Sequence, residues 1–136
     1  MNGYGAAAAA AAPATRPGQT VKGAYMASGP SEQASLAETL RQRVLEGPGE
    51  TDAALRQRVA ARASGGPPID PPYDDLARQI GEAACHTTDP QVARVLSAVR
   101  SEKAVFELIA AAATGAGWLR WQQAIKALEQ SDDAPA

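Results

Sequence analysis

The sequence predicts an all-α fold. Apolar residues recur at helical spacing along much of the chain, and no stretch alternates between apolar and polar residues as a half-buried strand would. Glycine and proline pairs interrupt this pattern and mark the connections. Only 28 of the 136 residues are large and apolar, and 16 of these fall between residues 73 and 130. We therefore expect the main helical domain to span residues 73–130.

Both ends of the chain are predicted to be disordered. Residues 1–33 are rich in Gly, Pro and Ala and hold few side chains that a core would bury, and residues 131–136 form a short disordered end. The alanine run at residues 6–12 has no basic residue before it and no strongly apolar centre, so it differs from a secretory signal. No apolar run is long enough to span a bilayer, and the single cysteine forms no internal disulfide. We expect a cytoplasmic protein without a membrane segment.

Residues 34–64 predict two short helices. Ser35 and Glu38 have the spacing of a capping box that would start the first helix, and the Gly-Pro-Gly sequence at residues 47–49 would end it. Asp52 would cap the second helix. The narrow apolar stripe of that helix consists of Leu55, Val59 and Ala63.

Residues 65–72 predict a linker, because the two proline pairs fix φ and remove amide donors. We place a domain boundary there. A third helix would start near Tyr73 and run to about Cys85. A fourth would start at Thr88, where a Thr-Asp-Pro-Gln sequence combines a capping box with proline in the first turn.

The sequence from Ser101 onward predicts two further helices. Ser101 would cap the first, and residues 118–128 would form the second, which is amphipathic. Between them, residues 110–117 are Ala, Thr and Gly. Such small side chains predict a close helix crossing, with Gly115 or Gly117 available to break or bend the chain.

The charge pattern argues against nucleic acid as a partner. Thirteen basic and 15 acidic residues are interspersed, with a net charge of −2, so no basic stripe is present. Glu102, Glu107 and Glu129 are interpreted as solvated helix faces, and Arg56 is placed on a face of its helix other than the apolar stripe. One His and one Cys do not complete a metal site, and no cofactor is expected. A helical unit of about 60 residues buries little apolar surface on its own and often buries more by forming an oligomer. We therefore predict a homo-oligomer held by residues 110–121.

Cys85 beside His86, with Glu82 one helical turn earlier, is the combination that suggests nucleophilic catalysis. These three are the candidate catalytic residues. A catalytic cysteine needs a cation, a helix N-terminus or a positioned base to favour its thiolate. Cys85 lies near a predicted helix C-terminus, where the dipole opposes the thiolate, and adjacent helical residues point about 100° apart. The alternative is a small half-buried thiol beside an exposed histidine.

Three aromatic residues are candidates for a ligand pocket or a subunit interface. Trp118 and Trp121 lie on one face of the last predicted helix, and Phe106 lies on the helix before it. Together they could surround a planar small-molecule ligand, or they could pack in a core or between subunits.

Residues 88–117 (TDPQVARVLSAVRSEKAVFELIAAAATGAG) combine a capped helix, a Ser-Glu pair and an Ala-rich helix that ends in small residues. This run resembles the C-terminal half of the carboxymuconolactone decarboxylase and alkylhydroperoxidase-D-like (AhpD-like) family. The sequence LEGPGETD at residues 45–52 and the proline-rich approach to Tyr73 are similar to a divergent branch of that family. The resemblance covers residues 45–136 and implies an AhpD-like helical domain.

Peroxidase members of that family carry Glu-x-x-Cys-x-x-Cys-x-x-x-His, in which one thiolate attacks peroxide and the other resolves it. Here Glu82 and Cys85 match the first half, but Thr88 stands at the second cysteine and Val92 at the histidine. Alignment from Ser101 shifts the frame by one. It then places Ala84, Thr87 and Gln91 at the two cysteines and the histidine. The resemblance implies a member without the dithiol motif.

Three functions remain open. The first is an oligomeric AhpD-like protein without catalysis. The second is an active small-molecule enzyme of the carboxymuconolactone decarboxylase or one-cysteine hydroperoxidase type. The third is a helical protein-interaction module. Clustering of the candidate catalytic and aromatic residues around one cavity would favour the enzyme, and their dispersal would favour the first function.

Overall fold

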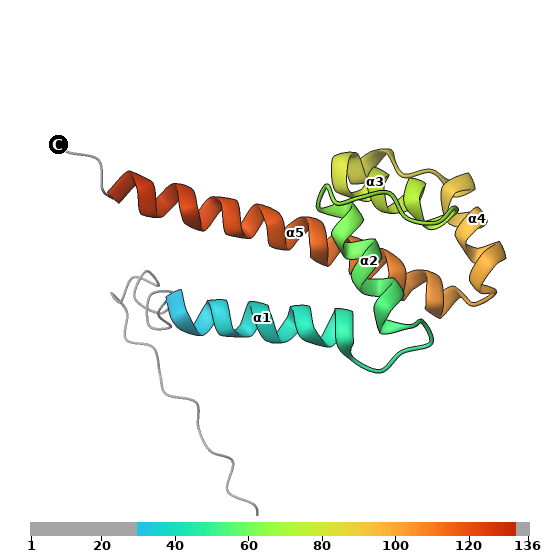
Figure 1. Cartoon of the computed structure of the whole chain (residues 1–136), viewed down its shortest axis with the longest axis horizontal. Helices are drawn as coiled ribbons and strands as arrows, with labels where there is room; N and C mark the ends of the chain where they lie inside the picture. Colours follow the sequence, from blue (N-terminus) through green and yellow to red (C-terminus); the bar gives the residue numbers. More distant parts are fainter. Residues whose placement is uncertain (1–29, 133–136) are drawn as a thin grey trace, which may run out of the picture.

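The computed structural model describes residues 30–132, in which every regular element is helical (Figure 1). The all-α prediction is confirmed. The elements are α1 (Pro30–Glu46), α2 (Ala53–Ala63), α3 (Tyr73–Ala83), the 3-10 helix η2 (Ala84–His86), α4 (Asp89–Val99) and α5 (Glu102–Asp132). The predicted disordered ends lie largely outside the described residues, since only their innermost residues fall in α1 and α5.

The helices form a bundle with a two-helix extension (Figure 1). α2, α3, α4 and the first half of α5 pack together, and α2 contacts α1, α3 and α5. α1 and the second half of α5 run antiparallel and project from this bundle. We use the term arm for α1 together with residues 118–131 of α5. Between residues 30 and 132, none of the helices has the length and apolar character that a membrane span needs.

One hydrophobic core joins residues from both sides of the expected domain boundary. Val59 of α2 packs in the same cluster as Leu76 of α3, Val95 of α4 and Leu108 of α5. Val95 and Leu108 are the largest side chains that are completely buried. The expected boundary at residues 65–72 is therefore corrected to a loop within one packed unit, which includes α2.

Asp74 and Arg62 fasten that loop. The Asp74 carboxylate accepts hydrogen bonds from the Ile69 amide at 2.9 Å and from Arg62 Nε at 2.7 Å. The Ile69 N–H and then the Arg62 guanidinium lower the pKa of Asp74. Arg62 also donates to the carbonyl of Gly66 at 3.0 Å. These bonds hold α3 against α2, a tertiary arrangement that proline pairs alone do not indicate.

Gln91 both starts α4 and attaches it to α3. The Thr88 amide donates to Gln91 Oε1 at 2.9 Å, and the two residues form the predicted capping box. Gln91 Nε2 donates to Asp75 at 3.0 Å, and Arg94 donates to the same carboxylate oxygen at 2.9 Å. The hydrogen bond from Gln91 and the neighbouring Arg94 lower the pKa of Asp75.

α1 begins earlier than the sequence indicated. It starts at Pro30 rather than at residue 34, so Ser35 lies inside the helix, where its carbonyl accepts a hydrogen bond from the Thr39 hydroxyl. Proline at a first helical position and Glu32 in the first turn are themselves favourable start signals. The predicted capping role of Ser35 is wrong for this reason.

α5 is one continuous helix of 31 residues where the sequence predicted two. Gly115 lies where α5 crosses α2, and a Cβ at this position would collide with the carbonyl of Ala60. Ala111 and Ala112, one turn earlier, are buried in the same crossing. The predicted close approach is confirmed, whereas the predicted break is wrong because Gly115 supplies space between two backbones rather than a bend.

Candidate functional site

The candidate catalytic residues lie at the exposed end of α3. Glu82 is in the last turn of α3, and Cys85 and His86 are on η2, so the predicted continuation of this α-helix to Cys85 is corrected. All three residues are exposed. The expectation of a half-buried Cys85 thiol is therefore corrected. Glu82 is paired with Arg78, whose Nη1 donates at 2.8 Å. Within residues 30–132, neither the Cys85 nor the His86 side chain has a hydrogen-bond partner, so no base is positioned to activate the thiol.

The three aromatic candidates occupy separate positions along α5. Phe106 is 70% exposed on the part of α5 that belongs to the bundle. Trp118 is partly buried where α5 passes α1, and Trp121 is exposed on the arm. Only Trp118 of these three lines the pocket described next, and none of Glu82, Cys85 and His86 does.

A pocket of about 390 Å³ lies between α1, α2 and α5. Its walls are Arg41, Leu45 and Glu46 of α1, Gln57, Ala60, Ala61 and Ser64 at α2, and Gly115 and Trp118 of α5. The Arg41 guanidinium lies over the Trp118 ring, 5.5 Å from the ring centre. Arg41 also makes two hydrogen bonds to Glu38, at 3.0 and 2.9 Å, and these lower the pKa of Glu38. The pocket therefore offers an aromatic wall beside charged side chains, which suits a small planar ligand.

Arg56 of α2 is the most deeply buried charged residue of the described chain, with 2% of its surface exposed. Its Nε donates to the Val44 carbonyl at 2.9 Å, and its two terminal nitrogens donate to the carbonyls of Thr51 and Gly47. These acceptors lie at the end of α1 and in the loop that follows it. Arg56 therefore fixes where α1 leaves the bundle.

Glu107 of α5 holds the same loop from the other side. Its carboxylate accepts hydrogen bonds from the Glu50 and Thr51 amides, both at 2.9 Å, and from the Thr51 hydroxyl at 2.7 Å. The hydrogen bond from the Glu50 amide is the largest cause that lowers the pKa of Glu107, to about 2. The two bonds from Thr51 and the nearby charge of Arg56 lower this pKa as well. We name the pair Arg56 and Glu107, with the loop at residues 47–52, the clasp.

The clasp was not predicted from the sequence, because Glu107 has the pattern of a solvated helix face and Arg56 lies outside the apolar stripe of its helix. The available signal was the Gly-Pro-Gly sequence. A Cβ at Gly49 would lie 2.8 Å from Glu107 Oε2 and 2.9 Å from Arg56 Nη1, so this position has no room for a side chain. The polar atoms of the clasp are engaged by the protein itself. The role of the clasp is to position α1.

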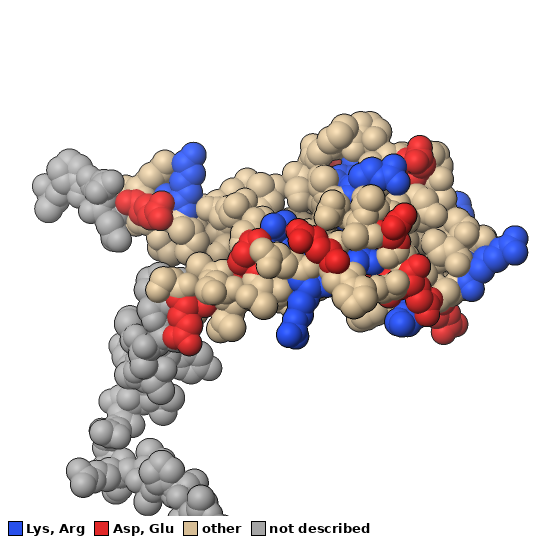
Figure 2. Space-filling model, turned by 60° about the horizontal axis from the view of Figure 1, so that its bottom comes forward, with Lys and Arg blue, Asp and Glu red and all other residues tan. Residues whose placement is uncertain are grey.

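The arm exposes large apolar side chains. Leu36 and Leu40 of α1 are 63% and 61% exposed, and Trp121 and Leu128 of α5 are 39% and 63% exposed. In the expected interface at residues 110–121, Ala111, Ala112 and Ala116 are buried within the chain, whereas Ala113, Gly117, Arg120 and Trp121 are exposed. Acidic and basic residues are interspersed on the face shown in Figure 2, without a continuous basic surface.

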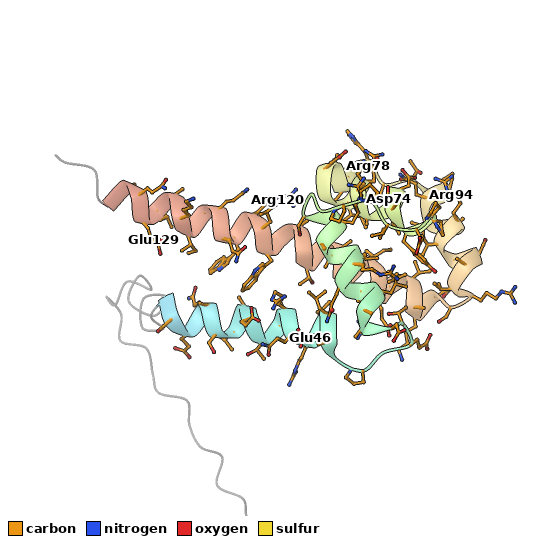
Figure 3. The ribbon with its side chains drawn as sticks, in the orientation of Figure 1. Glu46, Asp74, Arg78, Arg94, Arg120 and Glu129 are labelled. Atoms are coloured by element: carbon orange, nitrogen blue, oxygen red, sulfur yellow. The ribbon has the colours of Figure 1, made fainter. Side chains whose placement is uncertain are left out.

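Arg120 shows how α5 is oriented in the arm. It lies on the side of α5 away from α1 (Figure 3) and donates to the Gly81 carbonyl of α3 at 2.8 Å. Trp118, two residues earlier, faces Arg41 of α1. The second half of α5 is therefore held between α3 on one side and α1 on the other, and this fixes which of its faces remains open.

The described part of the chain contains no group of three or more His, Cys, Asp and Glu residues that could hold a metal ion. In comparisons with known proteins, no family model, no curated protein and no solved structure matches this chain.

Proposed function

We propose that this chain is a self-associating helical protein of the carboxymuconolactone decarboxylase and AhpD-like type that lacks dithiol peroxidase chemistry and acts in the cytoplasm. The observation that carries the proposal is the exposure of four large apolar side chains on the arm, Leu36, Leu40, Trp121 and Leu128. Large exposed apolar patches are uncommon on monomeric proteins, and they mark interaction sites. Burying it against another subunit would be favourable by about 25 cal/mol for each Å².

The arrangement around Cys85 supports the absence of peroxidase chemistry. The chain has a single cysteine, so no second thiol within it resolves a sulfenic acid. Cys85 is exposed on η2, away from the pocket at Trp118. The candidate catalytic residues and the aromatic residues are dispersed rather than gathered, which favours the non-catalytic function over the enzyme.

Two measurements test this proposal. Sedimentation velocity of the full chain over a wide concentration range should show a species larger than the monomer. Hydroperoxide consumption with an external thiol should be slow and should be the same for Cys85→Ser. A protein that stays monomeric at every concentration contradicts self-association. Rapid consumption that Cys85→Ser abolishes contradicts the absence of peroxidase chemistry.

A second candidate function is small-molecule binding or catalysis in the pocket at Trp118. It is favoured by the volume of that pocket and by the Arg41 guanidinium over its aromatic wall. The probes are aromatic carboxylates and aromatic amines, titrated while tryptophan fluorescence is recorded in a Trp121→Phe background. Saturable quenching that disappears in Trp118→Phe with Trp121 intact would support this function. The same quenching in both variants would count against it.

A further inference from the structure

The two helices of the arm face each other through Arg41 and Trp118. α1 runs toward the bundle and α5 runs away from it, so the pair is antiparallel (Figure 1). The Arg41 guanidinium over the Trp118 ring marks the line along which the helices meet. Every other residue of the arm can be placed around its helix from this line, because successive residues turn by about 100°.

On α1, the exposed leucines lie to one side of this line. Leu40 precedes Arg41 by one residue and is rotated by about −100°, and Leu36 is rotated by about −140°. On α5, Trp121 and Leu128 follow Trp118 and reach rotations of about −60° and about −80°. In two antiparallel helices that face each other, rotations of equal sign lead to the same side of the pair. The four exposed apolar residues therefore lie on one side of the pair, where Gln33 also lies at about −80°, and we name this side the apolar face of the arm.

The opposite side of the arm carries mostly polar residues, and Leu119 of α5 is the partly buried apolar residue there, at about +100° from Trp118. On α5, Gln123, Lys126 and Gln130 are rotated by about +140°, +80° and +120° from Trp118. On α1, Gln42 and Glu46 are rotated by about +100° and +140° from Arg41. Glu46 is labelled in Figure 3, near the end of α1 that joins the bundle. The polar side of the arm is thus hydrated. The opposite side has charged residues only at its outer edge, where Arg43 and Arg120 reach rotations of about −160°.

We propose that the apolar face of the arm docks on the same face of a second copy of this chain, so that two arms form a four-helix bundle. This inference rests on the proposed self-association and names the surface that performs it. Two antiparallel helices with one shared apolar face are half of a four-helix bundle. A two-fold axis would bring the same face of each copy together, and an apolar surface is complementary to itself.

The size of the face fits a second arm. α1 has 17 residues and is therefore about 25 Å long, and two helices side by side are about 20 Å wide. Such a face covers about 500 Å² on each copy, so a dimer would bury about 1,000 Å² in total, which meets the minimum area of a biological interface.

The charges of the arm also fit a second copy. The acidic residues of α1 (Glu32, Glu38 and Glu46) exceed its basic residues (Arg41 and Arg43) by one. The basic residues of the α5 part (Arg120 and Lys126) exceed its one acidic residue (Glu129) by one. The arm as a whole is neutral, so two arms approach without net repulsion. A strongly basic or acidic partner would find no matching charge on this surface.

The test compares three variants of the full chain by sedimentation velocity. Leu40→Glu combined with Leu128→Glu places charges on the apolar face. Phe106→Glu changes an equally exposed apolar residue on the bundle, and Gln123→Glu adds a charge to the polar side of the arm. We expect the double variant to raise the dimer dissociation constant at least about a hundredfold, while the two controls remain dimeric like the unmodified chain.

Helix content from circular dichroism shows whether each variant is folded. If the double variant fails to fold, Leu40→Gln with Leu128→Gln replaces it, with the same expected direction. A folded double variant that dimerises like the unmodified chain overturns the inference, and so does dissociation by Phe106→Glu instead. Either result leaves the proposed self-association intact and moves its surface elsewhere. An unmodified chain that is always monomeric overturns the self-association itself.

Discussion

Arg56 and Glu107 meet beneath the loop that connects α1 to α2, with Arg56 Nη1 3.8 Å from Glu107 Oε2. Arg56 binds the carbonyls of this loop and Glu107 binds its amides, so the two charges compensate each other and also satisfy the backbone around them. The pair is nearly enclosed, with 3% and 15% of the two side chains exposed. Removing one charge would leave the other buried without compensation.

We predict that Glu107→Gln lowers the free energy of unfolding by about 2 to 3 kcal/mol. Glutamine keeps the size of the side chain but removes the charge beside Arg56, and its NH₂ group cannot accept a bond from a loop amide. Chemical denaturation measures the effect. Glu129→Gln, on an exposed position of the same helix, is the control and should change stability little. Equal stability of the two variants would mean that the clasp does not hold the loop.

Stability should depend on pH through the same carboxylate. The pKa of Glu107 is about 2 in the folded protein and close to the ordinary value of 4.5 when the chain is unfolded. Since the folded-state pKa is lowered, the stabilisation is complete above about pH 4.5 and is lost as the pH falls toward 2. The difference in stability between the unmodified chain and Glu107→Gln should shrink in this range. Parallel pH curves would contradict the prediction.

Two glycines of α5 should respond oppositely to alanine. Gly115→Ala should lower the free energy of unfolding by about 2 kcal/mol, because its Cβ would collide with the backbone of Ala60 and push α5 from α2. Gly117 has no atom near the position of a Cβ. Gly117→Ala should therefore raise the free energy of unfolding by about 0.5 to 1 kcal/mol, through the higher helix propensity of alanine. Thermal and chemical denaturation distinguish these outcomes, and a loss of similar size in both would contradict the proposed crossing.

Arg41 should hold α1 against α5. We expect Arg41→Gln to speed amide hydrogen exchange in α1 by about threefold, because it removes the cation–π contact with Trp118 and the ion pair with Glu38. Exchange in α4, which lies in the bundle, should not change. Arg43→Gln, at an exposed position of the same helix, is the control. Faster exchange with the control variant as well would show that helix propensity, rather than the Arg41 contact, limits opening.

The sequence predicted the start of a helix well where the residues of a capping motif also make the capping hydrogen bonds in the structure. The capping box at Thr88 and the Ser101 cap, whose hydroxyl accepts a hydrogen bond from the Ala104 amide at 3.2 Å, are of this kind. A cap depends on atoms within one turn, so its residues are adjacent in sequence. The small residues before Trp118 likewise predicted a close crossing, since only small side chains permit it.

The candidate catalytic residues show the limit of such reasoning. Glu82, Cys85 and His86 lie close together in sequence, but whether they act together depends on the atoms around them. The structure places Glu82 in the last turn of α3 and the other two on η2, all of them exposed, and their predicted roles stay predictions. The clasp could not be predicted, because Arg56 and Glu107 are 51 positions apart and each alone has the pattern of a solvated charge.

The all-α class, most helix positions and the placement of small residues at one crossing can be predicted from the sequence, because these follow from spacing, capping and side-chain size within a helix. The packing of the helices is needed to see that Gly115 continues α5 rather than ending it, that residues 65–72 turn within one core, and that four exposed apolar residues share one side of the arm. Each of these depends on which helix lies beside another, and helix contacts join residues that no local pattern connects.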